Sequence, residues 1–250
     1  MLFSIVTVTL NNRKGLARTA ASISGQGCKD FEWIIIDGGS TDGTIEDLKS
    51  YNATLISEPD QGIYDAMNKG IVMAKGDYIL FLNAGDCLSN PDILAKIQSA
   101  ISHSKAEFIY GDSWEETNGQ LNYKPSRSHA SISLGMFTHH QAMIYKRETL
   151  GKLRYDLNYK ISADYDFTLR FLEKTKNPLR LKIPFCIFES GGISQQNART
   201  GRREQYAIRK KVHTVTSFEN KVIYTQQLIS RCLRSCAPVF YWKIKNRNSF

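Results

Sequence analysis

The sequence predicts an α/β fold, in which a mainly parallel central sheet carries helices on both faces and a basic helical extension follows it. Three observations support this prediction. Short apolar, β-branched runs alternate with helix-length segments through the first third of the chain, as expected where crossover helices join parallel strands. The run 78–82 is continuously apolar and aromatic, which is typical of a central strand covered on both faces. The excess positive charge lies after residue 195.

The predicted elements follow a regular order in the first half of the chain. Strands are expected at 4–10, 31–36, 54–57 and 77–82, and helices at 16–23, 45–51 and 63–74. The second half is less regular. There we expect a helix at 91–101 capped by Asn90, a polar loop at 126–135 and a helix at 163–172. Further strands are expected at 107–114, 120–123, 141–145 and 179–188.

The composition indicates a globular protein. Hydrophobic residues make up 42% and aromatic residues 11% of the 250 residues, enough for one large domain with an appendage. No apolar run approaches the roughly 18 residues that a membrane-spanning helix needs, and the first residues show no signal-peptide pattern. The five cysteines form no CxxC pair, which favours reduced thiols in the cytoplasm over a disulfide framework or a zinc site.

The charge distribution divides the chain into two parts. Residues 196–250 hold 12 Lys and Arg and 2 acidic residues, whereas residues 1–195 hold 21 and 22. We therefore expect a main domain at 1–195 and a basic helical extension at 196–250. Apolar residues at near-helical spacing, with aromatic and basic residues at 238–245, suit peripheral contact with the inner face of the cytoplasmic membrane. The alternatives are packing on its own domain or on a second copy in a homodimer. No nucleic acid is expected, because no recognised binding module accompanies the charge.

Polar residues follow three predicted strands at their carboxyl ends, where open α/β sheets bind ligands. Asn11 follows the first strand without the G-x-G-x-x-G of a dinucleotide site, which counts against a dehydrogenase. Asp37 ends the second strand, where a carboxylate can accept a hydrogen bond from a base or a ribose hydroxyl. Asp86, behind Asn83 and Gly85, is expected to hold a divalent metal that binds the diphosphate of a sugar nucleotide. The alternative for Asp86 is a cap of the following helix.

Two acidic residues at the start of the helix 163–172 are candidates for a catalytic base. Ser162 is a good N-cap, so Asp164 and Asp166 fall in the first turn, where the helix dipole favours anions in any case. Asp166 has Arg170 four residues on, the spacing of an ordinary helical ion pair. Asp164 has Thr168 at that spacing, so its carboxylate is left for chemistry. We expect Asp164 to be the base and Asp166 to be structural.

Four segments, in their order and spacing, resemble family 2 glycosyltransferases, and more narrowly the bacterial branch that builds exopolysaccharide, capsule and O-antigen. They are the first strand with Thr9 and Asn11, and the segments 36–44, 58–70 and 81–86. The resemblance covers about residues 3–195. It implies a GT-A fold, a sugar-nucleotide donor, a divalent cation (Mn²⁺ or Mg²⁺) and inversion at the anomeric carbon.

The resemblance also implies roles for residues on the donor side. Thr9 and Asn11 would line the base pocket, and Asp37 would contact the base, usually uracil. Asp60 would be a further donor-site acid. Asn68 would lie on a helix packed beside the nucleotide.

The metal turn departs from the usual D-x-D of the family. Asn83, expected at the donor, and Gly85 stand at the two acidic positions, and only Asp86 is acidic. One carboxylate with substrate phosphates and waters can hold such a cation, so weak metal binding without nucleotide is expected. The family places its base second in a Glu-Asp pair, which here reads Ala163-Asp164.

The remaining candidates are expected on the acceptor or phosphate side. His139, His140 and Gln141 are similar to a His-Gln segment near the acceptor and donor phosphates of related enzymes. Because adjacent residues of a strand point to opposite faces, one of the two histidines is expected to be structural. Ser194, in a Gly-Gly-Ile-Ser turn, and Arg199 are expected near phosphate, and a plain surface turn is the alternative.

These inferences together predict an inverting, metal-dependent glycosyltransferase of the cytoplasm or the inner membrane face. It would move a sugar from a nucleotide-diphosphate donor, UDP-linked, to a hydroxyl of a saccharide or lipid-linked acceptor in bacterial surface polysaccharide synthesis. Two other classes stay open. One is a non-catalytic partner subunit that binds a nucleotide sugar, and the other is a Rossmann-type methyltransferase.

Overall fold

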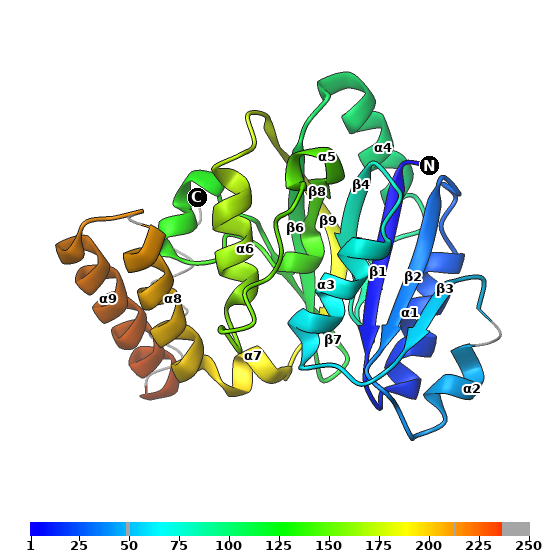
Figure 1. Ribbon diagram of the computed structural model, residues 1–250. Helices are drawn as coiled ribbons and strands as arrows, with labels where there is room; N and C mark the ends of the chain where they lie inside the picture. Colours follow the sequence, from blue (N-terminus) through cyan, green and yellow to red (C-terminus); the bar gives the residue numbers. More distant parts are fainter. Residues whose placement is uncertain (49–50, 213, 237–250) are drawn as a thin grey trace.

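The computed structural model describes residues 1–48, 51–212 and 214–236 (Figure 1). One sheet runs through the main body, in the strand order β3-β2-β1-β4-β8-β6-β9-β5, with β7 paired to β6. The strands are β1 (Phe3–Thr9), β2 (Phe31–Asp37), β3 (Thr54–Ser57), β4 (Tyr78–Phe81), β5 (Cys87–Leu88), β6 (Phe108–Thr117), β7 (Gln120–Lys124), β8 (Met143–Lys146) and β9 (Pro178–Glu189).

The helices connect and cover these strands. They are α1 (Arg13–Ser24), α2 (Thr44–Leu48), α3 (Ile63–Met73), α4 (Ile93–Ser104), α5 (Arg147–Leu150), α6 (Ala163–Leu172), α7 (Ile193–Gln196), α8 (Ala198–Val212) and α9 (Ser217–Cys236). Two 3₁₀ turns, η1 (His129–Leu134) and η2 (His140–Ala142), complete the described elements.

The first half of the sheet is parallel and the second half is mixed. β1 pairs in parallel with both β2 and β4, and β2 with β3. β8 is antiparallel to β4 and β6, whereas β9 runs parallel to β6. The parallel pairing follows from the crossover helices, because a strand that is reached through a helix returns in the same direction.

The sheet separates two apolar cores, as the sequence predicts. β1 is buried along its whole length, and its alternate residues face opposite sides. Val6 packs with residues of α3 and α6 in one core, and Ile5 packs with residues of α1 and α4 in the other. Helices therefore cover both faces of the sheet (Figure 1).

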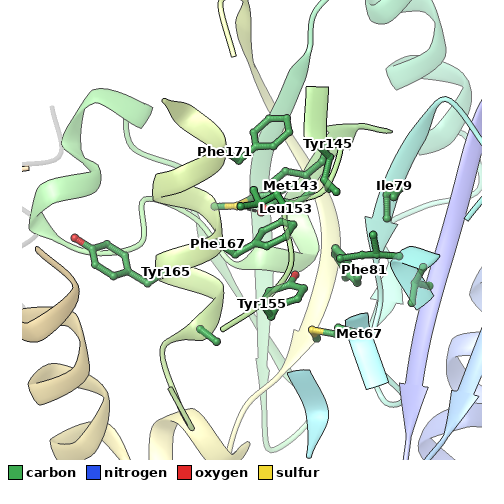
Figure 2. Packing of buried hydrophobic residues seen from close by; sticks show 14 of the residues in the cluster. Met67, Ile79, Phe81, Met143, Tyr145, Leu153, Tyr155, Tyr165, Phe167 and Phe171 are labelled. Atoms are coloured by element: carbon green, nitrogen blue, oxygen red, sulfur yellow. Dashed lines mark hydrogen bonds between the residues drawn. The ribbon is translucent and has the colours of Figure 1, made fainter. Parts of the chain in front are cut away.

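An aromatic layer fixes α6 against the sheet. Phe167 of α6 stacks on Tyr155 with ring centroids 4.2 Å apart, and Tyr155 meets Phe81 of β4 at 5.5 Å. Figure 2 shows these rings between α6 and the strands, together with Tyr145 of β8. The packing holds the start of α6 at a defined place relative to β4.

The elements differ from the expectations at a few positions. Helix α4 begins at Ile93 with Asp92 at its N-cap, not with Asn90, because the Asn90 side chain accepts from the Asp92 N–H at 3.0 Å in a local turn. The expected loop 126–135 contains the 3₁₀ turn η1, and the two-residue strand β5 is not predicted.

The described part of the extension contains the helices α8 and α9, which lie beyond α6 (Figure 1). Ile208 of α8 is buried in the core that contains α6, so α8 packs on its own domain. Buried Arg209 donates from Nε to Asn220 Oδ1 of α9 at 2.7 Å, which joins the two helices. The aromatic and basic segment 238–245 lies outside the described residues. Within the described part of the chain, no helix has the length and apolar character to cross a membrane.

Candidate active site

The carboxyl ends of β1, β2 and β4 meet at one edge of the sheet. Thr9 at the end of β1 stands opposite Asp37 at the end of β2. The Ala84 N–H, just beyond β4, donates to Val8 O at 3.1 Å. This register brings the Asp37 loop and the turn 83–86 to either side of the β1 end, as the sequence predicts for a ligand site.

Asp37 organises the loop that follows it. Its buried carboxylate accepts from the N–H groups of Gly39 at 3.1 Å and Ser40 at 3.0 Å, and from the hydroxyls of Ser40 and Ser57. Burial by itself raises the pKa of Asp37, but the bonds from Ser40, Ser57 and Gly39 outweigh it and hold the pKa below its ordinary value. The structure thus turns this carboxylate inward, and its contact with a base stays a prediction.

The other donor-side residues surround this loop. Asn11 has a positive φ of 48°, and its Oδ1 accepts from the Thr41 N–H at 2.8 Å. The buried Thr9 hydroxyl has no hydrogen-bond partner among the described residues. Asp60 Oδ2 lies 2.5 Å from the point where a Cβ on Gly38 would stand, so only a glycine lets this acid approach the loop.

Asn68 lies apart from this group. Its Nδ2 donates to Tyr155 O at 3.0 Å, and its Oδ1 accepts from the Tyr155 N–H at 2.8 Å. Both polar groups of the amide thus join α3 to the segment that precedes α6. A contact between Asn68 and the donor remains a prediction from the family resemblance.

Asp86 is buried between two elements from distant parts of the chain. Its Oδ2 accepts from Gln141 Nε2 at 2.6 Å, and its Oδ1 accepts from the Glu189 N–H at 3.2 Å. Burial raises the pKa of Asp86 to about 7, the two hydrogen bonds lower it, and the nearby Glu189 carboxylate raises it further. A buried carboxylate whose ionised form is costly favours a cation beside it.

Glu189 is a residue of this region that sequence reasoning missed. Gly85, with a φ of 105°, leaves a space in which a Cβ would stand 2.7 Å from Glu189 Oε2. The glycine at an expected acidic position therefore makes room for a carboxylate from the end of β9. A sequence signal exists, because Glu189 ends a predicted strand region just before the Gly-Gly-Ile-Ser turn.

The residues around Asp86 fit a divalent cation. Asp86 and Glu189 supply carboxylate oxygens, and the side-chain carbonyl oxygens of Asn83 and Gln141 are buried with no hydrogen-bond partner among the described residues. Oxygen donors of this kind suit Mg²⁺ and Mn²⁺. No cluster of three or more His, Cys, Asp or Glu able to hold a metal occurs in the described part of the chain, so donor phosphates would have to complete the coordination.

The two histidines have different surroundings. His139 Nδ1 lies 2.9 Å from Ser113 Oγ, and its ring packs on Phe188 at 4.5 Å. His140 Nε2 lies 3.4 Å from Asn83 Nδ2, and its Nδ1 lies 4.0 Å from Asp164 Oδ2. Burial lowers the pKa of His140 to about 4, so its ring is neutral at neutral pH. His140, not His139, contacts the other candidate residues.

Asp164 lies in the first turn of α6 with limited exposure. Its Oδ1 accepts from the Tyr165 N–H at 2.8 Å and lies 3.5 Å from the Tyr64 hydroxyl. Burial raises the pKa of Asp164 to about 6, which these hydrogen bonds oppose and the charge of Glu204 reinforces. A carboxylate with such a pKa is ionised at neutral pH and is still basic enough to take a proton.

The neighbours of Asp164 follow the sequence predictions in one respect and differ in another. Asp166 forms the predicted ion pair with Arg170, with Nε donating to Oδ2 at 2.8 Å. Ser162 stands at the N-cap of α6, but its hydroxyl accepts no hydrogen bond from the first turn of the helix and donates to Gly201 O at 3.0 Å. The hydroxyl is thus used to join α6 to α8.

The last two candidates lie after β9. Ser194 is in α7, and its side chain lies outside the described part of the structure. Arg199 is exposed in the first turn of α8. Their predicted contact with phosphate remains a prediction.

Solved structures show the class of fold. TarS of S. aureus superposes with a TM-score of 0.70 at 17% identity, covering 93% of this chain and 44% of TarS. Mannosyltransferase PcManGT of Pyrobaculum calidifontis, solved with GDP-Man and Mn²⁺, gives 0.67 at 14% identity, covering 94% and 75%. The fold is the GT-A fold, as predicted.

Sequence comparisons show the family. The model of "Glycosyl transferase family 2" matches residues 4–189. A PGL/p-HBAD biosynthesis glycosyltransferase of Mycobacterium bovis is 36% identical over 179 residues, 68% of this chain and 69% of the relative. The amylovoran biosynthesis glycosyltransferase AmsB of Erwinia amylovora is 26% identical over 192 residues, 67% and 63%. The chain belongs to glycosyltransferase family 2, and this membership excludes the methyltransferase alternative.

Proposed function

We propose that this glycosyltransferase transfers a sugar with inversion from a UDP-linked donor to an acceptor hydroxyl, with Asp164 as the base. One observation carries the proposal. Consecutive residues of the turn η2 contact both key acids, because His140 lies 4.0 Å from Asp164 Oδ2 and Gln141 lies 2.6 Å from Asp86 Oδ2. The proposed base and the proposed cation ligand are therefore linked through two consecutive residues of one short turn.

The proposed reaction is a single displacement. Asp164 takes the proton of the acceptor hydroxyl while the hydroxyl oxygen forms a bond to the anomeric carbon. The bond between that carbon and the donor phosphate oxygen breaks, and its electron pair leaves with the nucleoside diphosphate. Because one attack occurs from the face opposite the leaving group, the anomeric configuration inverts. The Tyr165 N–H donates to Asp164 Oδ1 at 2.8 Å and orients the carboxylate, whose Oδ2 lies 4.0 Å from Nδ1 of the neutral His140 ring.

Asp86 and Glu189, with the side-chain oxygen of Asn83, are the residues that would hold Mn²⁺ or Mg²⁺. When bound, such a cation supplies positive charge that stabilises the leaving diphosphate. Two carboxylates with buried amide oxygens around them support this assignment. The presence of two carboxylates also argues against the alternative of a non-catalytic subunit. Glu189 supplies a second acid beside the turn 83–86, in which Asp86 is the acidic residue.

The donor assignment rests on the likeness to known proteins and on the Asp37 loop. TarS has been solved with UDP and with UDP-GlcNAc. The loop held by Asp37 lies at the ends of β1 and β2, where Asn11 Oδ1 accepts from the Thr41 N–H. The experiment is a panel of UDP, GDP and dTDP sugars, measured by thermal shift and by release of nucleoside diphosphate, with and without Mn²⁺. Donor binding without release, whatever the acceptor added, would support the non-catalytic alternative.

The acceptor is proposed to be a saccharide or a lipid-linked saccharide in surface polysaccharide synthesis, reached from the cytoplasmic side. The names of the relatives support this class, since one acts in amylovoran and another in PGL/p-HBAD biosynthesis. Helix α9 exposes Phe218 by 76% and Ile229 by 53%, which supports a peripheral membrane contact. Flotation with anionic vesicles tests this contact. If the protein shows no salt-sensitive binding to the vesicles, the remaining role for this face is contact within a homodimer, which light scattering detects.

A further inference from the structure

Glu204, in the middle of α8, binds the segment that leads into the helix of the proposed base. Its Oε1 accepts from the Lys160 N–H at 2.8 Å. Its Oε2 accepts from the N–H groups of Ile161 at 2.9 Å and Ser162 at 2.8 Å. One carboxylate thus engages three consecutive backbone donors. Asp164 follows two residues after the last of them.

A second set of contacts holds the same segment. Ser162 Oγ donates to Gly201 O at 3.0 Å. A Cβ on Gly201 would stand 3.1 Å from Ile161 Cγ2, so α8 approaches this segment more closely than most side chains would allow. On the other side, the Tyr64 hydroxyl donates to Ile161 O at 2.8 Å and lies 3.5 Å from Asp164 Oδ1. The segment 160–162 is therefore held between α3 and α8.

We propose that Glu204 is a positioning residue for the base: it fixes the segment 160–162 and thereby the direction of the Asp164 carboxylate. The first helix of the extension is then part of the catalytic unit and not an appendage beyond residue 195. This proposal rests on the proposed function, because it takes Asp164 as the base. It adds a residue that acts through Asp164 without touching substrate.

The charge of Glu204 gives the proposal a second, separable consequence. In the described part of the chain, the titratable groups that interact with Asp164 are Tyr64 of α3, His140 of η2, Tyr145 of β8, Tyr155 and Glu204. Burial raises the pKa of the three tyrosines and lowers the pKa of His140, so these four are neutral at neutral pH. The negative charge of Glu204 raises the pKa of Asp164. Its removal should move the acid limb of the pH–activity profile to lower pH.

The test compares Glu204→Gln and Glu204→Asp with Glu219→Gln in the full chain. Glutamine keeps the size of the side chain but replaces one oxygen by an NH₂ group that cannot accept a backbone N–H. Aspartate keeps the charge on a shorter side chain. Glu219 is the matched control, because it accepts from the Thr216 N–H at 2.8 Å at the start of α9, in the same extension and remote from Asp164.

Glu204→Gln is expected to lower kcat by about 10- to 100-fold, since a misplaced catalytic group costs about this much. Its donor affinity, read by calorimetry with UDP, should stay near that of the unchanged protein, and its acid limb should move down. Glu204→Asp should recover part of kcat and keep the acid limb in place. Glu219→Gln should match the unchanged protein in kcat and in pH profile.

Three results overturn the proposal. The first is an unchanged kcat and acid limb in Glu204→Gln, and the second is an equal loss in Glu219→Gln. If Glu204→Gln does not fold, the Glu204→Asp variant takes its place in the test. The third overturning result is an unchanged kcat in Glu204→Asp. Asp164→Asn separates the two hypotheses: an active Asp164→Asn variant removes the proposed base itself, whereas an inactive one with a normal Glu204→Gln removes only the role of Glu204.

Discussion

Asp37 ends β2 and Asp86 lies in the turn that follows β4, the two strands that flank β1, yet the surroundings of the two acids differ. Asp37 accepts four hydrogen bonds from its own loop and from Ser57, and its pKa is lowered. Asp86 accepts two, is nearly as buried, and its pKa is raised to about 7. The fold itself stabilises the charged form of the first carboxylate, whereas burial keeps the charged form of the second costly.

This difference shows where the chain combines stability with function. The Asp37 loop is preorganised, so the proposed donor would need little ordering there. The buried side-chain oxygens of Asn83 and Gln141 have no hydrogen-bond partner among the described residues, a cost that the proposed ligand would offset. Four substitutions can break or sharpen the comparison.

Asp164→Asn should have the largest effect. Asparagine keeps the shape of the side chain but cannot take a proton, so kcat should fall by about 10²- to 10⁴-fold, the contribution typical of a general base. Binding of UDP, measured by calorimetry, should stay close to that of the unchanged protein because Asp164 and Asp86 are met by different residues of η2, His140 and Gln141. The neighbouring variant Asp166→Asn does not serve as a control, because it breaks the ion pair between buried Asp166 and Arg170.

Glu189→Gln should weaken Mn²⁺ binding by about 10- to 100-fold, the range seen when a group that supports a metal site is lost. The carboxylate beside Gly85 becomes a neutral amide, while the Glu189 N–H bond to Asp86 is kept. Electron paramagnetic resonance of Mn²⁺ in the presence of UDP reads the affinity without turnover. Glu148→Gln, which loses an exposed pair with Lys146 at the start of α5, serves as the control and should bind Mn²⁺ normally.

Asp37→Asn should lower the free energy of unfolding by about 1–3 kcal/mol, because an amide leaves one or more buried N–H groups of the loop without an acceptor. The depressed pKa of Asp37 means that its stabilisation is present above its ordinary pKa and is lost as the pH falls through the folded value. Urea unfolding at pH 7.5 measures the change. An unaltered midpoint would show that the loop does not depend on this carboxylate.

Asp86→Asn should change the free energy of unfolding in the opposite direction, and this effect should be the smallest of the four. We expect the variant to raise the stability of the metal-free protein by about 1–2 kcal/mol at pH 8. The raised pKa means that the charged form costs stability above the ordinary value, in full above about pH 7. Protonation of the folded state relieves the cost progressively as the pH falls from about 7 to the ordinary pKa of 3.8, so the variant and the unchanged protein should converge near pH 4. Gln141 can turn its unpartnered oxygen towards the new amide. Equal stability at pH 8 would contradict the cost of this buried charge.

The sequence predicted much of this structure because its signals are local. The strands β1 to β4 lie within one residue of their expected ends, since apolar runs and the glycines and polar residues that end them are short-range patterns. The carboxyl-end acids Asp37 and Asp86 are found by the same logic. So is the ion pair of Asp166 with Arg170, which depends only on helical spacing.

The site features that could not be predicted from the sequence depend on contacts between distant segments. Glu189 meets Asp86 across 103 positions, through the pairing of β9 with β5. Glu204 meets Ser162 across 42 positions. The inward turn of Asp37 and the choice between His139 and His140 depend on packing that no periodicity encodes.

The most direct test of the account is the anomeric configuration of the product, read by proton NMR after transfer from an α-linked UDP sugar with Mn²⁺. A base at Asp164 that acts in one displacement predicts a β-linked product from the first detectable turnover. An α-linked product would contradict both the single displacement and the role of Asp164.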